Sequence, residues 1–190
     1  MAQAEFDELN VLESQQDEMV SGIGEIIDDP NRAKISTNIE DDLEDLLFMA
    51  YALGSDYANR ILGTDVEADT KKIQDSVFKK IDGETWRERI RRHLEEGDLG
   101  LVQNVIRTES ERVYNEAVLD TTEESGEEAY KTWETMEDDR VRDPHVLLHG
   151  VRVPIDGYFW VDGARASAPH GFGVPELDCN CRCRLRITRK

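Results

Sequence analysis

The amino-acid sequence changes character near residue 120, and this change constrains the fold more than any other feature. Before that point, apolar residues recur at the spacing of amphipathic helices. After it, short runs of β-branched and aromatic residues alternate with glycines, which is typical of short strands joined by turns and long loops. Helices followed by strands favour an α+β fold, in which N-terminal helices precede a small C-terminal antiparallel β-sheet with long loops.

Several helices are predicted in the first part. The clearest begins at Ser36 or Thr37, either of which can cap it, and its apolar stripe extends to Leu53. Gly54 predicts a kink or break before a continuation over residues 57–62. Further helices are expected over residues 70–81, 85–96 and 99–119.

The first 35 residues are interpreted as an acidic arm. Residues 1–50 hold fourteen carboxylates against Arg32 and Lys34. The arm contains either a short helix over residues 5–19 or a segment that orders only on a partner. The predicted division is therefore an arm at 1–35, a helical region at 36–120 and a small β module at 121–190. Strands of this module are expected over residues 130–136, 151–154, 158–161 and 181–187.

The charge of the chain limits its partners. The 42 acidic residues outweigh 23 basic ones and give a net charge of -19, which opposes binding of nucleic acid by the whole surface. Because an acidic, lysine-poor surface stays hydrated when molar salt shortens the Debye length to about 3 Å, the composition favours a salt-loving host over an ordinary acidic protein. The C-terminal tail is positively charged, in contrast to the rest of the chain, and could bind phosphate, the protein's own carboxylates or an acidic neighbouring protein. Its basic residues are Arg182, Arg184, Arg186, Arg189 and Lys190.

Three cysteines alternate near the C-terminus. On a strand, Cys179, Cys181 and Cys183 would point to one face. Together with His145, they are candidate ligands of a structural zinc ion, and His149 or His170 are further candidates. The Cys-x-Cys spacing differs from that of most zinc fingers, so buried thiols without metal or a disulfide remain alternatives.

A second cluster of polar residues precedes the cysteines. Asp139, Arg142 and His145 have two interpretations. A carboxylate, a guanidinium and an imidazole could perform acid–base chemistry on a phosphoester. The interpretation we favour is structural, with charge-assisted hydrogen bonds that tie a strand end to the following loop while His145 and Leu148 face inward.

The order of motifs over residues 99–185 resembles the phage Mu protein F-like head morphogenesis family of tailed viruses. The resemblance begins with the helix Arg107-Thr108-Glu109-Ser110-Glu111-Arg112-Val113-Tyr114-Asn115-Glu116-Ala117. It continues through Trp133, Asp139-Arg140-Val141-Arg142, His145, Leu148, Gly150, Val153-Pro154, Phe159 and Asn180-Cys181-Arg182-Cys183. The extra thiol of Cys179 and the displacement of a proline to Pro175 depart from the family pattern, which affects the expected shape of the closing loop.

The resemblance implies a minor structural protein of the viral head without an enzymatic activity. It implies the portal protein or the major capsid protein as partners, a role in head assembly or genome packaging and ejection, and a location in the virion after synthesis in the host cytoplasm. Packaged DNA is a further candidate partner, through the basic tail. No apolar stretch approaches the roughly 20 residues that cross a membrane, so none is expected to do so. The alternatives are a metal-dependent nucleic-acid hydrolase, with His145 and the thiols as ligands and Asp139 as base, and an effector delivered with the virion.

Overall fold

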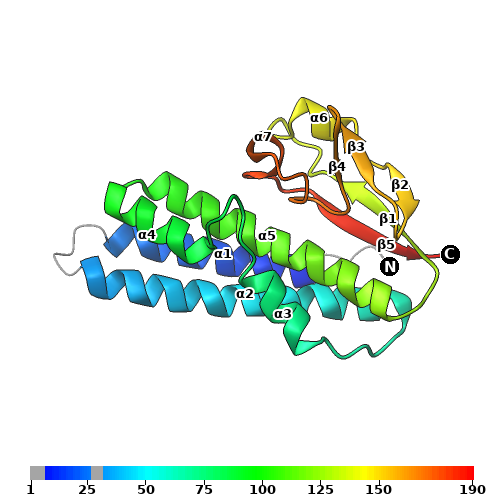
Figure 1. Cartoon of the computed structure of the whole chain (residues 1–190), viewed down its shortest axis with the longest axis horizontal. Coiled ribbons are helices and arrows are strands. Elements are labelled where there is room, and N and C mark those ends of the chain that lie inside the picture. The colour runs from blue at the N-terminus through cyan, green and yellow to red at the C-terminus, as the bar shows by residue number, and fades with distance from the viewer. Residues whose placement is uncertain (1–6, 27–31) are drawn as a thin grey trace.

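The structure is a computed structural model that describes residues 7–26 and 32–190. Its N-terminal half is helical (Figure 1) and contains α1 (Asp7–Ile26), α2 (Arg32–Leu62), α3 (Thr70–Val77), α4 (Trp86–Glu96) and α5 (Leu99–Glu124). Among the described residues no helix is both long and apolar enough to cross a membrane.

The long helices α2 and α5 form the centre of the helical half. Apolar side chains from both are fully buried, including Leu43, Leu47 and Val113. The predicted break at Gly54 is wrong, because α2 runs unbroken through it. A Cβ at this position would collide with the carbonyl oxygen of Tyr114 and lie 2.9 Å from Cβ of Ala117. Gly54 therefore serves close packing of the two helices instead of bending one of them.

The shorter helices begin at the residues whose side chains cap them. Thr85 accepts a hydrogen bond from the backbone N–H of Glu88, and Glu88 accepts one from Thr85, so α4 begins with a capping box. It ends at Gly97, which has a left-handed φ of 73°. Asp69 caps α3, but this helix ends at Val77, four residues before the predicted end at residue 81.

The helix α1 packs against α2 and α5. Leu12 and Ile23 are buried in the shared core, and the buried Gln16 donates a hydrogen bond to the Ser110 hydroxyl at 2.7 Å. Within the predicted acidic arm, residues 7–26 are thus helical and in contact with the same chain. Residues 1–6 and 27–31 lie outside the described residues, and the division of the chain at residues 35 and 120 stays a prediction.

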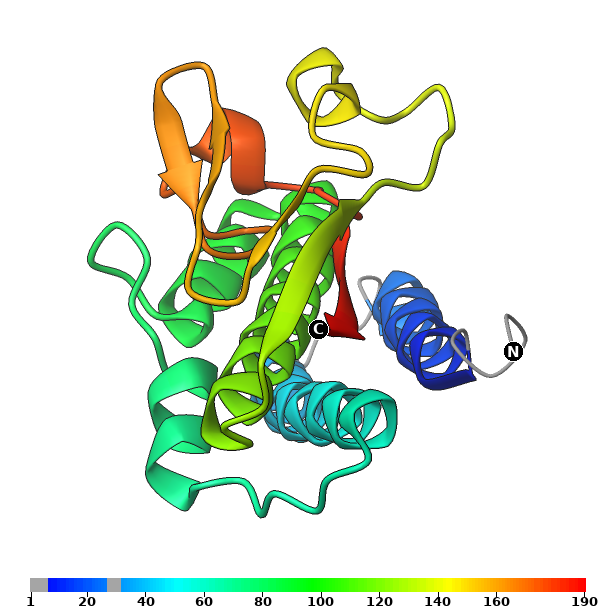
Figure 2. The same cartoon turned by 90° about the vertical axis from the view of Figure 1, so that its right-hand side faces the viewer.

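The C-terminal module consists of a small sheet and a hairpin. In the sheet, β1 (Ala129–Glu134) lies between β2 (Arg152–Pro154) and β5 (Arg184–Arg189), and both pairings are antiparallel. The hairpin pairs β3 (Phe159–Val161) with β4 (Ala164–Ala166). Two short helices, α6 (Asp143–Val146) and α7 (Pro175–Asp178), lie in the loops (Figure 2). The predicted α+β fold is confirmed, although β4 was not predicted and β5 begins three residues after the predicted start.

Strand β5 joins the module to the helices. Two of its backbone N–H groups donate to side chains of the helical half: Leu185 N to Asn115 Oδ1 at 2.9 Å, and Ile187 N to the Tyr57 hydroxyl at 3.2 Å. Asn115 also donates to the Cys183 carbonyl at 3.4 Å. The outer edge of β5, which would otherwise be an open edge of the sheet, is therefore covered by side chains of the same chain. The contact with Cys183 also holds the loop before β5 in place.

Candidate metal centre

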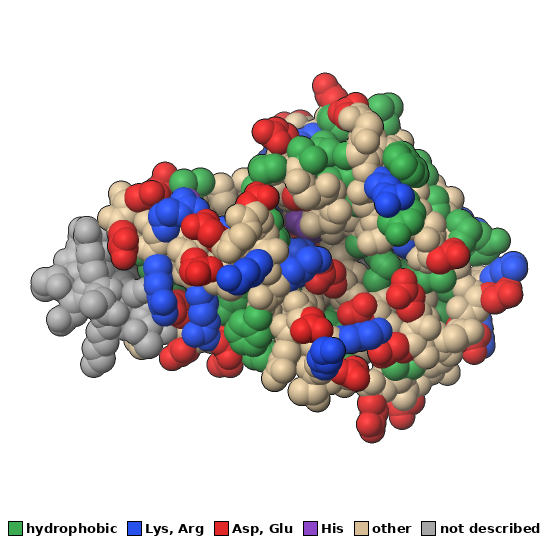
Figure 3. All heavy atoms as spheres, in the orientation of Figure 1, with side chains coloured by type: hydrophobic (Ala, Val, Ile, Leu, Met, Phe, Trp, Pro, Cys, Tyr) green, Lys and Arg blue, Asp and Glu red, His purple; other side chains and the backbone are tan. Residues whose placement is uncertain are grey.

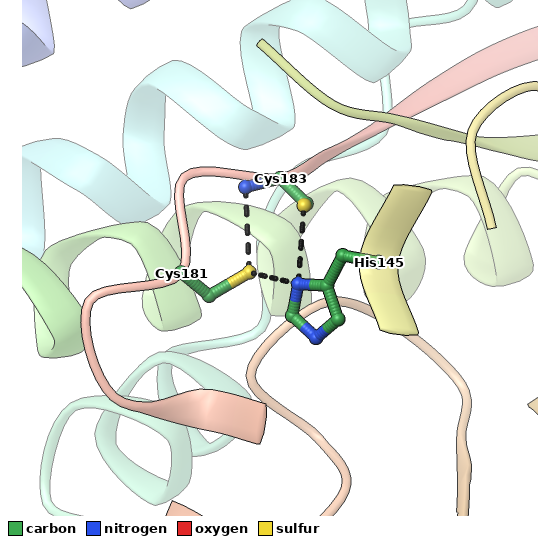
Figure 4. Close-up of side chains that lie close together, drawn as sticks. All are labelled: His145, Cys181 and Cys183. Carbon is green, nitrogen blue, oxygen red and sulfur yellow. Dashed lines mark hydrogen bonds between the residues drawn. The ribbon is translucent and has the colours of Figure 1, made fainter. Parts of the chain in front are cut away.

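His145, Cys181 and Cys183 meet inside the C-terminal module (Figure 4). The Nδ1 atom of His145 lies 3.5 Å from the sulfur of Cys181 and 3.5 Å from that of Cys183. The three ligand atoms lie within 4.8 Å of one another, and the three residues are 2–4% exposed. This group could hold a metal ion such as zinc, since imidazole nitrogen and thiolate sulfur are the ligands that zinc prefers.

The local sequence explains how these side chains converge. Pro144 stands in the first turn of α6, where a missing backbone N–H costs nothing, and this one-turn helix presents His145. Asn180 has a left-handed φ of 54°, and its N–H donates to the Thr108 hydroxyl of α5 at 3.1 Å. The chain then turns so that the Cys183 N–H points at the Cys181 sulfur, 3.4 Å away. The two thiols thus approach one imidazole.

The structure does not bring Cys179 into this group. The predicted alternation along a strand is wrong, because β5 begins only at Arg184 and the turn at Asn180 separates Cys179 from the other two thiols. Cys179 is exposed, and all three cysteines are free. The extra thiol that distinguishes this sequence therefore lies outside the centre.

Aromatic rings enclose the group. Trp133 contacts the His145 ring edge-on, with 5.5 Å between ring centroids. Phe172 stacks on the His145 ring at 6.1 Å, and Phe159 contacts Trp133 at 5.2 Å. These contacts shield the thiols and the imidazole from water.

The two thiols differ in their acidity. The hydrogen bond from the Cys181 thiol, followed by hydrogen bonding and charge from His145, holds the pKa of Cys183 below its usual value. The same interaction and burial raise the pKa of Cys181. Cys183 is therefore the more readily ionised of the pair, and a thiolate is the form that binds a metal.

The two other candidate histidines lie at different positions. His149 Nδ1 accepts a hydrogen bond from Thr135 N at 3.2 Å, and its Nε2 lies 3.5 Å from Glu137, so it is occupied outside the group. His170 is buried, its Nδ1 lies 3.0 Å from the carbonyl oxygen of Asp178, and its Nε2 has no hydrogen-bond partner among the described residues. Burial lowers the pKa of His170 and so favours the neutral imidazole.

The predicted tie between strand end and loop exists, but with a different carboxylate. Asp139 is exposed, whereas Asp138 forms a bidentate ion pair with Arg182 at 2.6 and 2.8 Å. These hydrogen bonds lower the pKa of Asp138 to about 2. Arg142 donates to the carbonyl oxygens of Leu177 and Cys179, so it locks the α7 loop. Of the proposed catalytic set, His145 lies in the buried group, Arg142 is engaged with backbone, and Asp139 faces solvent.

The basic tail contacts the protein's own carboxylates. Arg182 pairs with Asp138, as described above, and the other four basic residues also meet acidic partners. These pairs are Arg184 with Glu111 and Glu13, Arg186 with Glu134, Arg189 with Glu127, and Lys190 with Glu128. Of the three alternatives for the tail, the structure shows the intramolecular one, and contact of the tail with packaged DNA stays a prediction.

Sequence reasoning missed the residues that support the centre from outside. Asp138, Thr108 and Asp178 hold the loop around Asn180, but each is a common polar residue whose role depends on the three-dimensional path of the chain. Thr108 and Asn115 had a signal, because both stand in the helical motif that contributes to the resemblance.

The comparison with known families agrees with this architecture. The model of the family described as "Phage Mu protein F like protein" matches residues 70–186, which is more than half of the chain. The chain belongs to the phage Mu protein F-like family. Proteins of this family are head morphogenesis proteins of tailed phages. No curated protein and no solved structure matches the chain.

The family match covers the centre and its supports. It spans α3 to the first half of β5 and so includes His145, Cys181 and Cys183 as well as Asn115 on α5. In this family the usual role is structural, and head components are the implied partners. The match does not bear on the host, so a salt-loving host stays a prediction.

Proposed function

We propose that this chain is a minor structural protein of a tailed-phage head, where it binds the portal protein or the inner face of the capsid and acts in head assembly or in genome packaging and ejection. The observation that carries the proposal is that residues of the family motifs are engaged in internal contacts. They hold the module to the helices instead of lining a site with free reactive groups.

The helical motif illustrates this internal role. Arg112 is 1% exposed, and its guanidinium donates to Glu109 at 2.8 Å, to Glu116 at 2.6 Å and to the Ser76 carbonyl at 2.8 Å. Glu109 is also bound by Arg89 at 2.7 Å. Such a network fixes α3, α4 and α5 to one another, as a rigid building part requires.

Zinc at the His145, Cys181 and Cys183 group would be a structural cofactor of the module. Buried sites rich in thiolates usually close a fold instead of binding substrate. Here the three ligands come from α6 and from the loop before β5, which Arg142 also ties together through its hydrogen bonds to the carbonyl oxygens of Leu177 and Cys179. A bound ion would therefore fix the module in one shape for assembly.

The exposed hairpin is the surface we assign to the portal or capsid protein. Trp160 is 62% exposed and lies opposite Arg165 in the hairpin. The Arg165 guanidinium stacks on the rings of Tyr158 and Trp160 at 4.7 and 5.8 Å. Tryptophan, tyrosine and arginine dominate the binding energy of protein interfaces. Apolar side chains also gather on the C-terminal module in Figure 3, whereas acidic and basic side chains intermix over the helices.

The acidic surface of α1 is a second contact in this proposal. Asp17 and Glu18 on α1 are exposed, and a basic groove of a portal or capsid protein would complement them. The virion is then the place where the protein acts, after synthesis in the host cytoplasm.

A metal-dependent hydrolase is the second candidate, because a cleft adjoins the centre. The cleft has a volume of about 700 Å³ and contains Cys181 in its lining, so a substrate could approach the metal. Its basic side chains would attract a phosphodiester, although carboxylates line it as well; the charged lining residues are Arg107, Arg140, Arg142, Arg182, Glu13, Asp17 and Glu111. No observation favours a virion-delivered effector. A nuclease assay with zinc, comparing the wild type with His145→Ala, tests the hydrolase: activity that depends on His145 would support it over the structural role.

The structural role is tested by complementation of phage particles that lack the protein. We expect the wild type to co-purify with heads, as detected by mass spectrometry, and Trp160→Ala with Arg165→Glu to lower its amount at least tenfold. Leu101→Ala with Lys80→Glu changes an exposed apolar and an exposed basic residue of the helical half and should leave the amount unchanged. Absence of the wild-type protein from mature and immature heads would contradict the proposal.

A further inference from the structure

We propose that His170 is the fourth ligand of the metal centre, so that the chain itself closes the site with two nitrogen and two sulfur ligands. The inference rests on the zinc proposed for His145, Cys181 and Cys183. It adds that the ion is enclosed by protein and has no position open to a substrate.

The first observation is a buried nitrogen without a partner. His170 is 5% exposed, and its Nε2 atom makes no hydrogen bond in the part of the chain that the structure describes. Most buried polar atoms in folded proteins have a partner, so each exception calls for a cause such as a missing ion. A metal ion would supply the partner that this nitrogen lacks.

The second observation concerns the tautomer of the ring. His170 Nδ1 lies 3.0 Å from the carbonyl oxygen of Asp178. A carbonyl oxygen only accepts hydrogen bonds, so Nδ1 carries the proton and Nε2 carries the lone pair. Histidines that bind metals commonly donate their other N–H to a carbonyl group in this way. The ring is thus held in the form that a metal ligand requires.

The third observation places this ring beside the centre. The same Asp178 carbonyl oxygen accepts a hydrogen bond from Cys181 N at 3.3 Å, so one atom bridges the His170 ring and the backbone of a thiol ligand. Phe172, two residues after His170, stacks on the ring of His145. The loop that carries His170 therefore contacts both parts of the group.

The loop also has a backbone that is fixed from several sides. The Asp178 carboxylate accepts hydrogen bonds from the N–H groups of Phe172, Gly173 and Val174 at 2.7–3.2 Å. His170 has a left-handed φ of 65°, which few residues other than glycine adopt. Strained conformations of this kind persist where the surroundings impose them, and they cluster at ligand sites.

The test measures zinc binding by the purified full chain under reducing conditions. We expect one zinc ion per wild-type chain, and a cobalt(II) absorption spectrum of a four-coordinate site with two thiolates. His170→Asn keeps a residue that tolerates the left-handed backbone but removes the imidazole. It should weaken zinc binding at least tenfold, because even loss of a group that only supports a metal ligand costs roughly 10–100-fold. His170→Cys should restore binding and strengthen the thiolate bands of the cobalt spectrum.

Matched controls use the same residue types outside the group. His149→Asn and Cys179→Ser should bind zinc like the wild type. If His170→Asn fails to fold, ¹⁵N spectra of the wild-type histidine rings decide, because zinc should shift one nitrogen of His145 and Nε2 of His170.

The outcomes separate this inference from the zinc proposal. A wild-type chain that binds no zinc overturns both. Wild-type affinity and an unchanged cobalt spectrum in His170→Asn, or a zinc-induced shift of the His145 ring alone, overturn only the assignment of His170. The site would then keep an open position facing the cleft beside Cys181.

Discussion

The helical half and the C-terminal module bury polar groups in different ways. In the helical half the buried guanidinium of Arg112 and the buried carboxylate of Glu109 are paired with each other and with further charged side chains. In the module, the ammonium group of Lys131 and the Nε2 atoms of His145 and His170 are buried and have no hydrogen-bond partner within residues 7–26 and 32–190. In the helical half, Trp86 Nε1, Arg87 Nε and Arg89 Nε also lack a hydrogen-bond partner among the described residues, but both arginines form ion pairs through another nitrogen. In the module, the burial of the unpartnered groups is explained by an ion or offset elsewhere.

The largest effect is expected from breaking the buried ion network of the helical half. Burial disfavours the charged forms of Glu109 and Glu116, and the guanidinium of Arg112 offsets this cost for both carboxylates. Arg112→Met would remove this shared cation. We expect a loss of about 3–5 kcal/mol of unfolding free energy in urea denaturation. Arg92→Met breaks the exposed pair with Glu84 and should have a much smaller effect. Equal effects of the two variants would contradict the network.

Close packing between α2 and α5 gives the next effect. Gly54→Ala would push a methyl group against the Tyr114 carbonyl and should destabilise the protein by about 1–3 kcal/mol, measured by thermal or urea unfolding. Gly22→Ala is the matched control, because nothing lies within 4 Å of the added Cβ in α1. Alanine is the better helix former, so this control should gain about 0.5–1 kcal/mol. A neutral Gly54→Ala would show that the helices are less tightly packed than described.

The junction between the two regions is tested at Asn115. Asn115→Ala would leave the N–H of Leu185 and the carbonyl of Cys183 without their side-chain partner. We expect a cost of about 1–3 kcal/mol together with faster hydrogen exchange at Leu185. Asn104→Ala, on the same helix and partly exposed, should leave exchange in β5 unchanged.

Lys131 gives a pH-dependent prediction for the module. Burial lowers the pKa of Lys131 to about 8, below the value of roughly 10.4 expected in the unfolded chain. Between pH 8 and pH 10.4, the unfolded state therefore binds more protons than the folded state, and the free energy of unfolding rises with pH. Below pH 8 both states carry the charged ammonium group, and its burial destabilises the folded state in full. Lys131→Met should stabilise the protein by roughly 1–3 kcal/mol at pH 7, and its advantage should shrink above pH 8.

The control for this measurement is the exposed Lys80, since Lys80→Met should show no such pH dependence. If Lys131→Met destabilises the protein at pH 7, the contact of the ammonium group with the Phe159 ring, 5.9 Å from its centroid, outweighs the cost of burial. The contrast between the two regions would then be weaker.

Local patterns predicted most of the helices and the order of strands. Capping residues and glycines such as Thr85 and Gly97 act within one turn of chain, so their effects can be predicted from sequence. Gly54 could not be interpreted correctly, because the contact that requires it comes from Tyr114, sixty residues away. For the same reason the spacing of the thiols wrongly predicts a strand, because the turn at Asn180 depends on a hydrogen bond to Thr108.

The candidate site was predicted in part. His145, Cys181 and Cys183 were named from residue type and spacing, and the structure brings these three together. The motif predicts Asp139 as the carboxylate that ties the loop, whereas Asp138 pairs with Arg182. Sequence alone does not say in which direction neighbouring side chains of a loop point.

Hydrogen exchange with and without a chelator tests most directly whether the module depends on a metal while the helical half does not. On removal of zinc, amides of residues 143–148 and 177–189 should exchange faster, while those of α2, α4 and α5 keep their protection. Unchanged exchange in the module, or equal loss of protection in both regions, would contradict the account.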